Sequence, residues 1–419
     1  MRDIFTEIWA TARRNKLRTA LTGFSVAWGI FMLIFLLGAG NGLINAQMQS
    51  TDRYLASSMV AFGGRTSKPY AGLGSGRGIS LREQDMATTD SVFAGVVGDV
   101  GAVYDHGGVT LSAGANYMAG QTLSGVYPVD RDINKTEVVE GRFINDIDMR
   151  ERRKVAVISE DQARELWPHG GSPVGKYVKA DGLMWRVVGV YRGDGMMKAS
   201  DVYCPHATVC AIYSTDSRVG NIEFTFDGLE TEQQNNDFEA DYRAKLNLNH
   251  SAAPDDDNAV WLWNRFMDNI QMARGMGILR TALWVVGLLT LLSGVVGVSN
   301  IMLITVRERT REFGIRKAIG ARPKDILRLI IAESIIITSV FGYIGMLCGI
   351  LTNLYMDATM GHMVMDSGIF RATMFVDPTV GLDVCIKATL TIIIAGTIAG
   401  LIPAIKASRI RPIEALRAE

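Results

Sequence analysis

Residues 307–321 read RERTREFGIRKAIGA, and seven of these fifteen residues carry a charge. This charged segment lies between two of the most apolar stretches of the chain, residues 278–306 and 326–355. Each stretch is long enough to cross a bilayer, which takes about 20 residues as a helix. The segment is therefore predicted to be a short charged helix that connects two membrane spans.

The composition fits a protein that lies partly in a membrane. The chain has 43 basic and 43 acidic residues, so its formal net charge of zero gives no reason to expect nucleic acid as a partner. Hydrophobic residues make up 48% of the chain, which is high for a soluble protein and low for one that is membrane throughout. We therefore expect a few spanning helices together with a soluble domain.

Four stretches are predicted to span the bilayer. They lie at residues 20–43, 271–306, 326–355 and 380–402. The first is too long for a cleavable signal peptide, and no small-residue cleavage pattern follows it. The predicted fold class is a membrane protein with four transmembrane α-helices and a large α+β extracytoplasmic domain, residues 44–270, between the first and second spans.

Lysine and arginine residues orient these spans. The loop at residues 307–325 carries seven of them and the tail at residues 403–419 carries four, whereas the loop at residues 356–379 carries only Arg371. Because short cytoplasmic loops are enriched in Lys and Arg, both termini and residues 307–325 are predicted to be cytoplasmic. The domain at residues 44–270 and the short loop at residues 356–379 are then outside the cytoplasm.

The first 19 residues carry five basic side chains and the i,i+4 apolar pairs Ile4/Ile8 and Phe5/Trp9. This pattern is typical of an amphipathic helix that lies on the cytoplasmic membrane surface, in contact with lipid. An ordinary extension of the first span gives the same pattern, so both interpretations stay open.

The domain between the first two spans shows strand and helix patterns together. Strands are predicted at residues 57–62, 154–159, 185–191 and 221–226, and helices at 81–90, 160–167 and 231–248. Residues 70–78 and 251–258 are predicted to be exposed loops. Cys204 and Cys210 are close enough in sequence to pair in an oxidising compartment, and the sequence leaves open whether they do.

No catalytic or metal-binding motif is present in the sequence, and we expect the chain to be no enzyme and to bind no cofactor or metal itself. Residues 170–177, GGSPVGKY, contain the GxxxxGK spacing of a phosphate-binding loop. Tyr177 stands where that loop needs Ser or Thr, and the following residues alternate like a strand, so no helix N-terminus is available for phosphate. A turn between strands is the prediction here.

Two patterns concern the spans themselves. Residues 264–306 lack proline and are predicted to form one helix about 60 Å long, which exceeds the ~30 Å bilayer core and makes a force-transmitting stalk. A break at residues 275–277, Gly-Met-Gly, is the alternative. The GxxxG pairs Gly345/Gly349 and Gly396/Gly400 predict close helix packing, with the general enrichment of glycine in spanning helices as the alternative for any single pair. Glu333 is predicted to make an interhelical bond or to reach the interface rather than to relay protons.

The residues from Arg307 to Ser334, RERTREFGIRKAIGARPKDILRLIIAES, resemble the FtsX/MacB-like permease family of ABC transporters. The family pattern is close to E-R-T-x-E-I-G-I-R-[KR]-A-[IL]-G-A, and Phe313 departs mildly from it. The ending PAIKASRIRPIEALRAE, residues 403–419, resembles the family's C-terminal pattern. Residues 157–191 and 201–209 look like a MacB-type external domain, so the resemblance covers the whole chain.

The resemblance implies that the 307–325 loop holds a coupling helix that docks on a cytoplasmic ABC ATPase. It assigns that role to Glu308, Arg309, Arg311, Glu312, Gly314, Ile315, Arg316, Lys317 and Gly320. ATP would be bound by the separate ATPase, and the permease would pair with a second copy or a paralogue in a bacterial inner membrane. ATP-driven closure would move the external domains through the stalks without substrate crossing the spans.

The resemblance leaves several functions open. Efflux from the periplasm, with a periplasmic adaptor and an outer-membrane channel, is the leading one. Lipoprotein release and regulation of a cell-wall hydrolase are alternatives, and a membrane scaffold with no ATPase is the plainest. The substrate is not predicted.

Overall fold

The computed structural model describes residues 16–51, 54–193, 199–214, 216–360, 364–366, 371–373 and 375–409. The chain divides into two compact units. The helical unit comprises residues 1–47, 274–364 and 373–419, and the sheet unit comprises residues 48–273 and 365–372. Most of the predicted N-terminal helix, residues 1–19, and the last ten residues of the predicted tail lie outside the described residues.

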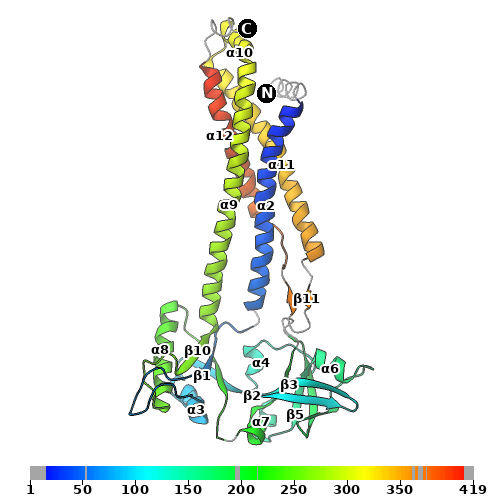
Figure 1. Ribbon diagram of the computed structural model, residues 1–419, viewed down its shortest axis with the longest axis vertical. Coiled ribbons are helices and arrows are strands. Elements are labelled where there is room, and N and C mark those ends of the chain that lie inside the picture. Colours follow the sequence, from blue (N-terminus) through cyan, green and yellow to red (C-terminus); the bar gives the residue numbers. More distant parts are fainter. Residues whose placement is uncertain are drawn as a thin grey trace. The chain divides into compact units, whose positions relative to one another are not determined.

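The helical unit is built from four long helices and one short one. All four long helices are long and apolar enough to span a membrane, which confirms the predicted number of spans. Figure 1 shows them as the long coiled ribbons. The helices are α2 (Lys16–Thr51), α9 (Arg265–Glu308), α10 (Thr310–Ala318), α11 (Pro323–Met360) and α12 (Leu382–Ser408).

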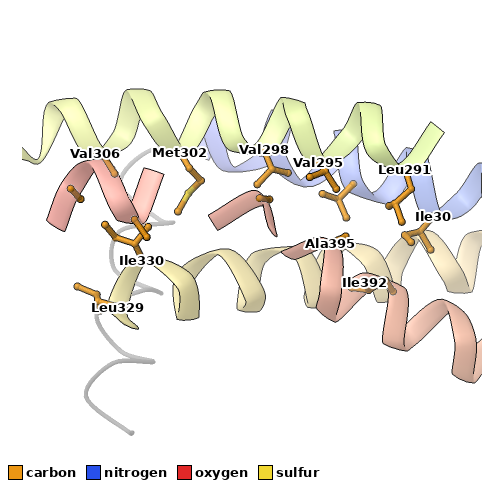
Figure 2. Close-up of a cluster of buried hydrophobic side chains, with 14 of the residues drawn as sticks. Ile30, Leu291, Val295, Val298, Met302, Val306, Leu329, Ile330, Ile392 and Ala395 are labelled. Atoms are coloured by element: carbon orange, nitrogen blue, oxygen red, sulfur yellow. The ribbon is translucent and has the colours of Figure 1, made fainter. Parts of the chain in front are cut away.

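The core of the helical unit is formed by aliphatic side chains from all four long helices (Figure 2). Ile30 of α2, Val298 of α9 and Ile330 of α11 are each at most 1% exposed. Hydrogen bonds within the bundle join helix pairs: Ser334 donates to the Gly396 carbonyl at 2.9 Å, and Asn353 donates to the Ile34 carbonyl at 3.0 Å. Such buried side-chain bonds fix helix register where apolar packing alone is not directional.

Helix α9 is continuous through residues 275–277, which confirms the predicted single helix and excludes the alternative of a break there. Its 44 residues give a length of roughly 66 Å at 1.5 Å per residue. Gly275 and Gly277 have open space where a Cβ would stand. These glycines are therefore not required for packing, and their cost in helix propensity, about 1 kcal/mol each, is not offset by a neighbour.

The sheet unit contains one ten-stranded sheet in the order β10-β1-β9-β2-β3-β8-β5-β7-β4, with β6 paired to β2 and β7. Most pairs are antiparallel, and β3/β8 and β5/β7 are parallel. A separate two-stranded sheet joins β11 (Val364–Asp366) and β12 (Arg371–Thr373). The strands of the large sheet are β1 (Ser58–Gly63), β2 (Val97–Ala113), β3 (Asn116–Val126), β4 (Val138–Gly141), β5 (Val155–Ser159), β6 (Tyr177–Ala180), β7 (Leu183–Tyr191), β8 (Asp201–Pro205), β9 (Asn221–Phe226) and β10 (Val260–Asn264).

Short helices complete the sheet unit. They are α3 (Glu83–Val92), α4 (Asp130–Ile133), α5 (Asp146–Arg150), α6 (Glu160–Leu166), α7 (His206–Tyr213) and α8 (Glu232–Asn249). Helix α8 begins at a capping box in which the Thr231 hydroxyl accepts from the Gln234 amide. Its Tyr242 is fully buried against Phe224 of β9 and shares a hydrogen bond with Thr89 of α3.

All the predicted strands and helices of this unit are present, and the longest strands that were not predicted are β2 and β3. The four predicted strands correspond to β1, β5, β7 and β9, and the three predicted helices to α3, α6 and α8. Strands β2 and β3 form a hairpin whose glycines obscure the alternation in the sequence. Its two-residue turn contains Gly114 at φ 63°, a conformation that favours glycine.

Three further sequence interpretations can be compared with the structure. Cys204 and Cys210 are both free thiols, and Cys204 is buried in the core. The structure therefore contains no disulfide between them, a pairing that the sequence left open. Residues 170–177 lead into strand β6 and not into a helix, as predicted for a turn. Asp256 contradicts the predicted exposure of residues 251–258: its carboxylate is buried and accepts bonds from the Ser67 amide and hydroxyl.

Candidate functional site

The charged segment that follows α9 forms a separate short helix, α10. The chain leaves α9 after Glu308 and re-enters helix at Thr310, whose hydroxyl donates to the Arg307 carbonyl at 2.7 Å. Helix α10 ends near Gly320, which lies at φ 107° and so ends the helix where a side chain would be strained. Pro323 then begins α11, a position where its missing N–H costs nothing.

One side of α10 is tied to the membrane helices through Arg309. Its guanidinium donates two hydrogen bonds to the Glu312 carboxylate, at 2.8 and 3.0 Å, and a third to Glu333 of α11 at 3.3 Å. The Arg309 side chain is 15% exposed and that of Glu333 is 7% exposed, so this pair is shielded from solvent. The guanidinium also lies 5.2 Å from the centre of the buried Phe313 ring.

A second tie joins α10 to the end of α12. The Lys317 ammonium donates to the Ser408 carbonyl at 2.6 Å. This carbonyl belongs to the last turn of α12, where the helix dipole favours a cation. The segment that contains α10 is therefore bonded to α11 and α12 at the same time.

The Glu312 carboxylate is held between two arginines, Arg309 at i−3 and Arg316 at i+4. The hydrogen bonds from Arg309 are the main cause that lowers the pKa of Glu312, and the charge of Arg316 adds to the effect. A lowered pKa keeps this carboxylate ionised at neutral pH. The pairs that it forms are consequently intact under ordinary cellular conditions.

The opposite side of α10 is exposed and partly apolar. Arg311, Ile315 and Ile319 follow one another at a spacing of four residues, which places them on one helix face. Ile315 is 43% exposed and Ile319 is 83% exposed. Glu308 and Gly320 are exposed beside this face. A face with apolar and basic side chains, on a helix fixed from behind, has the chemistry of a protein docking surface.

The nine residues predicted for coupling thus fall into two groups. Arg309 and Lys317 bond to α11 and α12, Glu312 pairs with Arg309 and Arg316, and Gly314 is buried, whereas Glu308, Arg311, Ile315 and Gly320 are exposed. Sequence reasoning missed Ile319 and Phe313 in this set. The i,i+4 spacing of Ile315 and Ile319 is the signal that would have shown the former.

The four glycines predicted for helix packing lie at close helix contacts. A Cβ on Gly345 would collide with the Ala27 carbonyl oxygen of α2, and one on Gly349 would collide with the Ile34 side chain. Added Cβ atoms on Gly396 and Gly400 would collide with Thr338 and Ser334 of α11. Glu333, predicted to make an interhelical bond or to reach the interface, makes the bond with Arg309.

Comparison with known proteins places this arrangement in a family. The model of the MacB-like periplasmic core domain matches residues 19–240, more than half of the chain. The chain belongs to the MacB-like permease family. The model of the FtsX-like permease C-terminal region matches residues 284–412, which include the C-terminal part of α9 and all of α10, α11 and α12. The family to which this MacB-like chain belongs provides permease components of ABC transporters.

Named relatives of this MacB-like chain are export proteins. The pyoverdine export ATP-binding/permease protein PvdT of Pseudomonas entomophila is 28% identical over 98% of this chain and 59% of its own length. The macrolide export ATP-binding/permease protein MacB of Bdellovibrio bacteriovorus is 27% identical over 98% of this chain and 60% of its own length. The chain thus spans about three fifths of the length of these curated relatives.

A solved structure is also similar to part of this chain. The periplasmic region of MacB from Actinobacillus actinomycetemcomitans covers 54% of this chain and 95% of its own, with 19% identity and a TM-score of 0.43.

Proposed function

We propose that this chain is the non-catalytic permease subunit of an export system and transmits the motion of an ATP-binding subunit to its sheet unit. The observation that carries the proposal is the two-sided helix α10. Its exposed face offers Ile315 and Ile319 to a partner, and its inner face is bonded to α11 and α12. The names of the relatives, ATP-binding/permease proteins for export, support an ATP-binding partner and an export role.

In this proposal the partner binds ATP, and α10 and the membrane helices of this chain transmit the resulting motion. Two permease copies, or this chain and a paralogue, face each other so that two ATP-binding subunits can close beneath them. The sheet units then move on the far side of the membrane, where an adaptor and an outer-membrane channel receive the substrate. No substrate needs to pass between the four spans.

The docking face can be tested by replacing Ile315 and Ile319 with Asp. We expect the amount of ATP-binding subunit that co-purifies with the tagged chain to fall at least about tenfold, because two exposed apolar contacts are each worth about 1–2 kcal/mol in an interface. The subunit is detected by photolabelling with an azido-ATP. Tyr117→Asp, at a side chain 72% exposed in the sheet unit, is the matched control.

Recovery of the same labelled subunit by the double variant would remove α10 as the docking site. Absence of any nucleotide-labelled subunit from the unmodified chain would favour a scaffold and would overturn the proposal as a whole.

The proposed orientation places α10 and both termini in the cytoplasm and the sheet unit in the periplasm. Single cysteines at the exposed positions Asp237 of α8 and Lys324 of α11 report the two sides. In a background without the native cysteines, a membrane-impermeant maleimide applied to spheroplasts is expected to label Asp237→Cys within minutes. Lys324→Cys is expected to react only after permeabilisation, and the reverse pattern would invert the topology.

A further inference from the structure

A cavity of about 470 Å³ lies on one face of the large sheet, within the range of small-molecule pockets. Its walls come from five adjacent strands, in the order β1, β9, β2, β3 and β8. Each strand contributes two residues spaced by two, and such residues point to the same face. The pairs are Val60/Phe62, Asn221/Glu223, Val103/Asp105, Ser124/Val126 and Asp201/Tyr203.

The alternate residues of these strands pack on the other face. Ile222 and Phe224 of β9 belong to the core that includes α8 residues, and Leu123, Val202 and Cys204 belong to the core that includes Leu166 and Val209 of α6 and α7. Two faces of the same strands therefore differ in kind. One is a hydrophobic core, and the other carries acidic and aromatic side chains around a space, next to a smaller core that includes Val126.

Two buried carboxyls lie at the centre of the cavity wall. Asp130 of α4 and Glu223 of β9 are each 2% exposed. Asp130 Oδ2 accepts a bond from Asn134 at 2.8 Å, while Asp130 Oδ1 and Glu223 Oε1 accept none from a donor in the described part of the chain. The two carboxyls hydrogen-bond to each other, which requires one proton between them, and a cation that enters the cavity could take the place of this proton.

The only cationic side chain that lines this cavity, among the described residues, is Arg265, and it makes hydrogen bonds to other groups of the protein. Arg265, the first residue of α9, donates to the Ile133 carbonyl at 3.2 Å and to Asn134 Oδ1 at 2.9 Å. Its guanidinium also lies 4.2 Å from the Tyr54 ring centre and 4.9 Å from that of Trp263. Arg265 therefore holds the wall together and partly balances the acid pair, while its buried Nε has no acceptor among the described residues.

The pKa values of the two buried carboxyls, Asp130 and Glu223, are both raised. Burial raises the pKa of Asp130 to about 6 and raises that of Glu223 well above its usual range, to which the Asp130 charge contributes. The charged groups facing the pair are Arg265, Asp105 and Asp201, and Tyr203 lies beside it. Without a ligand, one proton between the two carboxyls satisfies both; a cation beside them would take the place of that proton.

We propose that this cavity is a binding site for an organic cation with an apolar body. Four carboxyl groups, those of Asp105, Asp130, Asp201 and Glu223, face one committed arginine, which selects positive charge. The aromatic rings of Phe62 and Tyr203 on the same wall supply apolar surface for such a cation, whereas Arg265 already lies over the rings of Tyr54 and Trp263. A metal ion fits less well, since no group of three or more potential ligands is placed for one among the described residues.

The site is reached from solvent, because Asp105 on the same wall is exposed. Since the proposed function is export from the far side of the membrane, a cation held here would be a candidate substrate or regulator of that process. The binding itself does not depend on the proposed function. It is measured without ATP and without a partner, so it can fail while coupling through α10 holds, and the reverse.

The test uses the full chain in lipid nanodiscs and two permanent ions of the same shape, tetraphenylphosphonium and tetraphenylborate. Equilibrium binding of the radiolabelled ions is measured against empty nanodiscs. We expect saturable binding of the phosphonium and at least about tenfold weaker binding of the borate. Equal saturable binding of both ions, or none of either, would overturn the proposal.

Three variants locate the binding. Glu223→Gln and Asp130→Asn keep side-chain shape and remove charge, and each is expected to weaken phosphonium binding at least about tenfold. Asp105→Asn, at an exposed position that is safe for folding, should weaken it severalfold. Asp237→Asn removes the same charge from the exposed surface of α8 and serves as the control. The melting temperature of each variant is measured alongside, and unchanged affinity in all three cavity variants would overturn the proposal.

Proton competition gives an independent readout. Because the probe has no titratable group, any pH dependence belongs to the protein. Affinity for the phosphonium should fall as the pH is lowered from 8 to 5.5, where the acid pair retains its proton, and Asp130→Asn should flatten this dependence. An affinity that rises on acidification would contradict the proposed exchange of proton for cation.

Discussion

Exchanging Glu312 and Arg316, as Glu312→Arg with Arg316→Glu, is expected to uncouple ATP hydrolysis from movement of the sheet unit. The exchange puts a second guanidinium next to that of Arg309, so two charge-assisted hydrogen bonds become a repulsion. Such bonds contribute about 1.5–3 kcal/mol each when shielded, and less for a carboxylate that is 40% exposed. A loss of about 1.4 kcal/mol already changes an equilibrium tenfold.

Movement is measured with an environment-sensitive fluorophore on Asp237→Cys in nanodiscs that contain the ATP-binding subunit. The ATP-dependent fluorescence change per ATP hydrolysed should fall at least about tenfold, while assembly and folding persist. The matched control exchanges Asp383 and Lys387, an exposed i,i+4 pair on α12 with an N–O distance of 3.3 Å. If the α10 exchange leaves coupling at the control level, α10 is not the coupling helix.

Gly277→Pro is expected to reduce the same fluorescence change by a similar or larger factor. Proline removes one helix hydrogen bond and clashes with the preceding turn, which costs about 3 kcal/mol or more and kinks the helix. Gly277 lies inside the continuous α9, so the kink falls between α10 and the sheet unit along the chain. A kinked α9 is expected to transmit less of the displacement of α10 to the sheet unit than a straight α9.

Gly277→Ala is the control for this position, because the Cβ meets open space and alanine favours helix by about 1 kcal/mol. It should retain or slightly increase coupling. ATP hydrolysis and phosphonium binding should remain in both variants, since neither α10 nor the cavity is touched. Normal coupling in Gly277→Pro would show that force does not travel through α9.

The parts of the fold that sequence reasoning found are those with a local pattern. The apolar runs of the spans and the alternation of residues 185–191 stand out in any window of the chain. Strand β2 was missed because one of its faces lines a cavity and carries Asp105, and because Gly107 and Gly108 interrupt its middle. Where a strand face serves a site and not a core, the period of two is lost from the sequence.

The candidate sites show the same limit at longer range. The charge of residues 307–321 is evident in the sequence, but the pairing of Arg309 with Glu333 joins residues 24 apart and decides which side of α10 faces inward. Asp130 and Glu223 are 93 residues apart, and only the sheet and α4 bring them to one wall. No local spacing announces such a pair, so a motif search finds nothing there.

The pairing of β1 with β10 has a consequence for how the sheet unit is built. Met59, at the start of β1, is the direct partner of Asn264, at the end of β10. The first and last strands of the segment Ser58–Asn264 therefore pair with each other, so that its two ends lie side by side. The hydrogen bonds between β1 and β10 close this long segment of chain, so contacts within the segment itself compensate the entropy lost on bringing its ends together. We expect such a module to fold without its membrane anchors when it is excised and joined to another protein by a short linker.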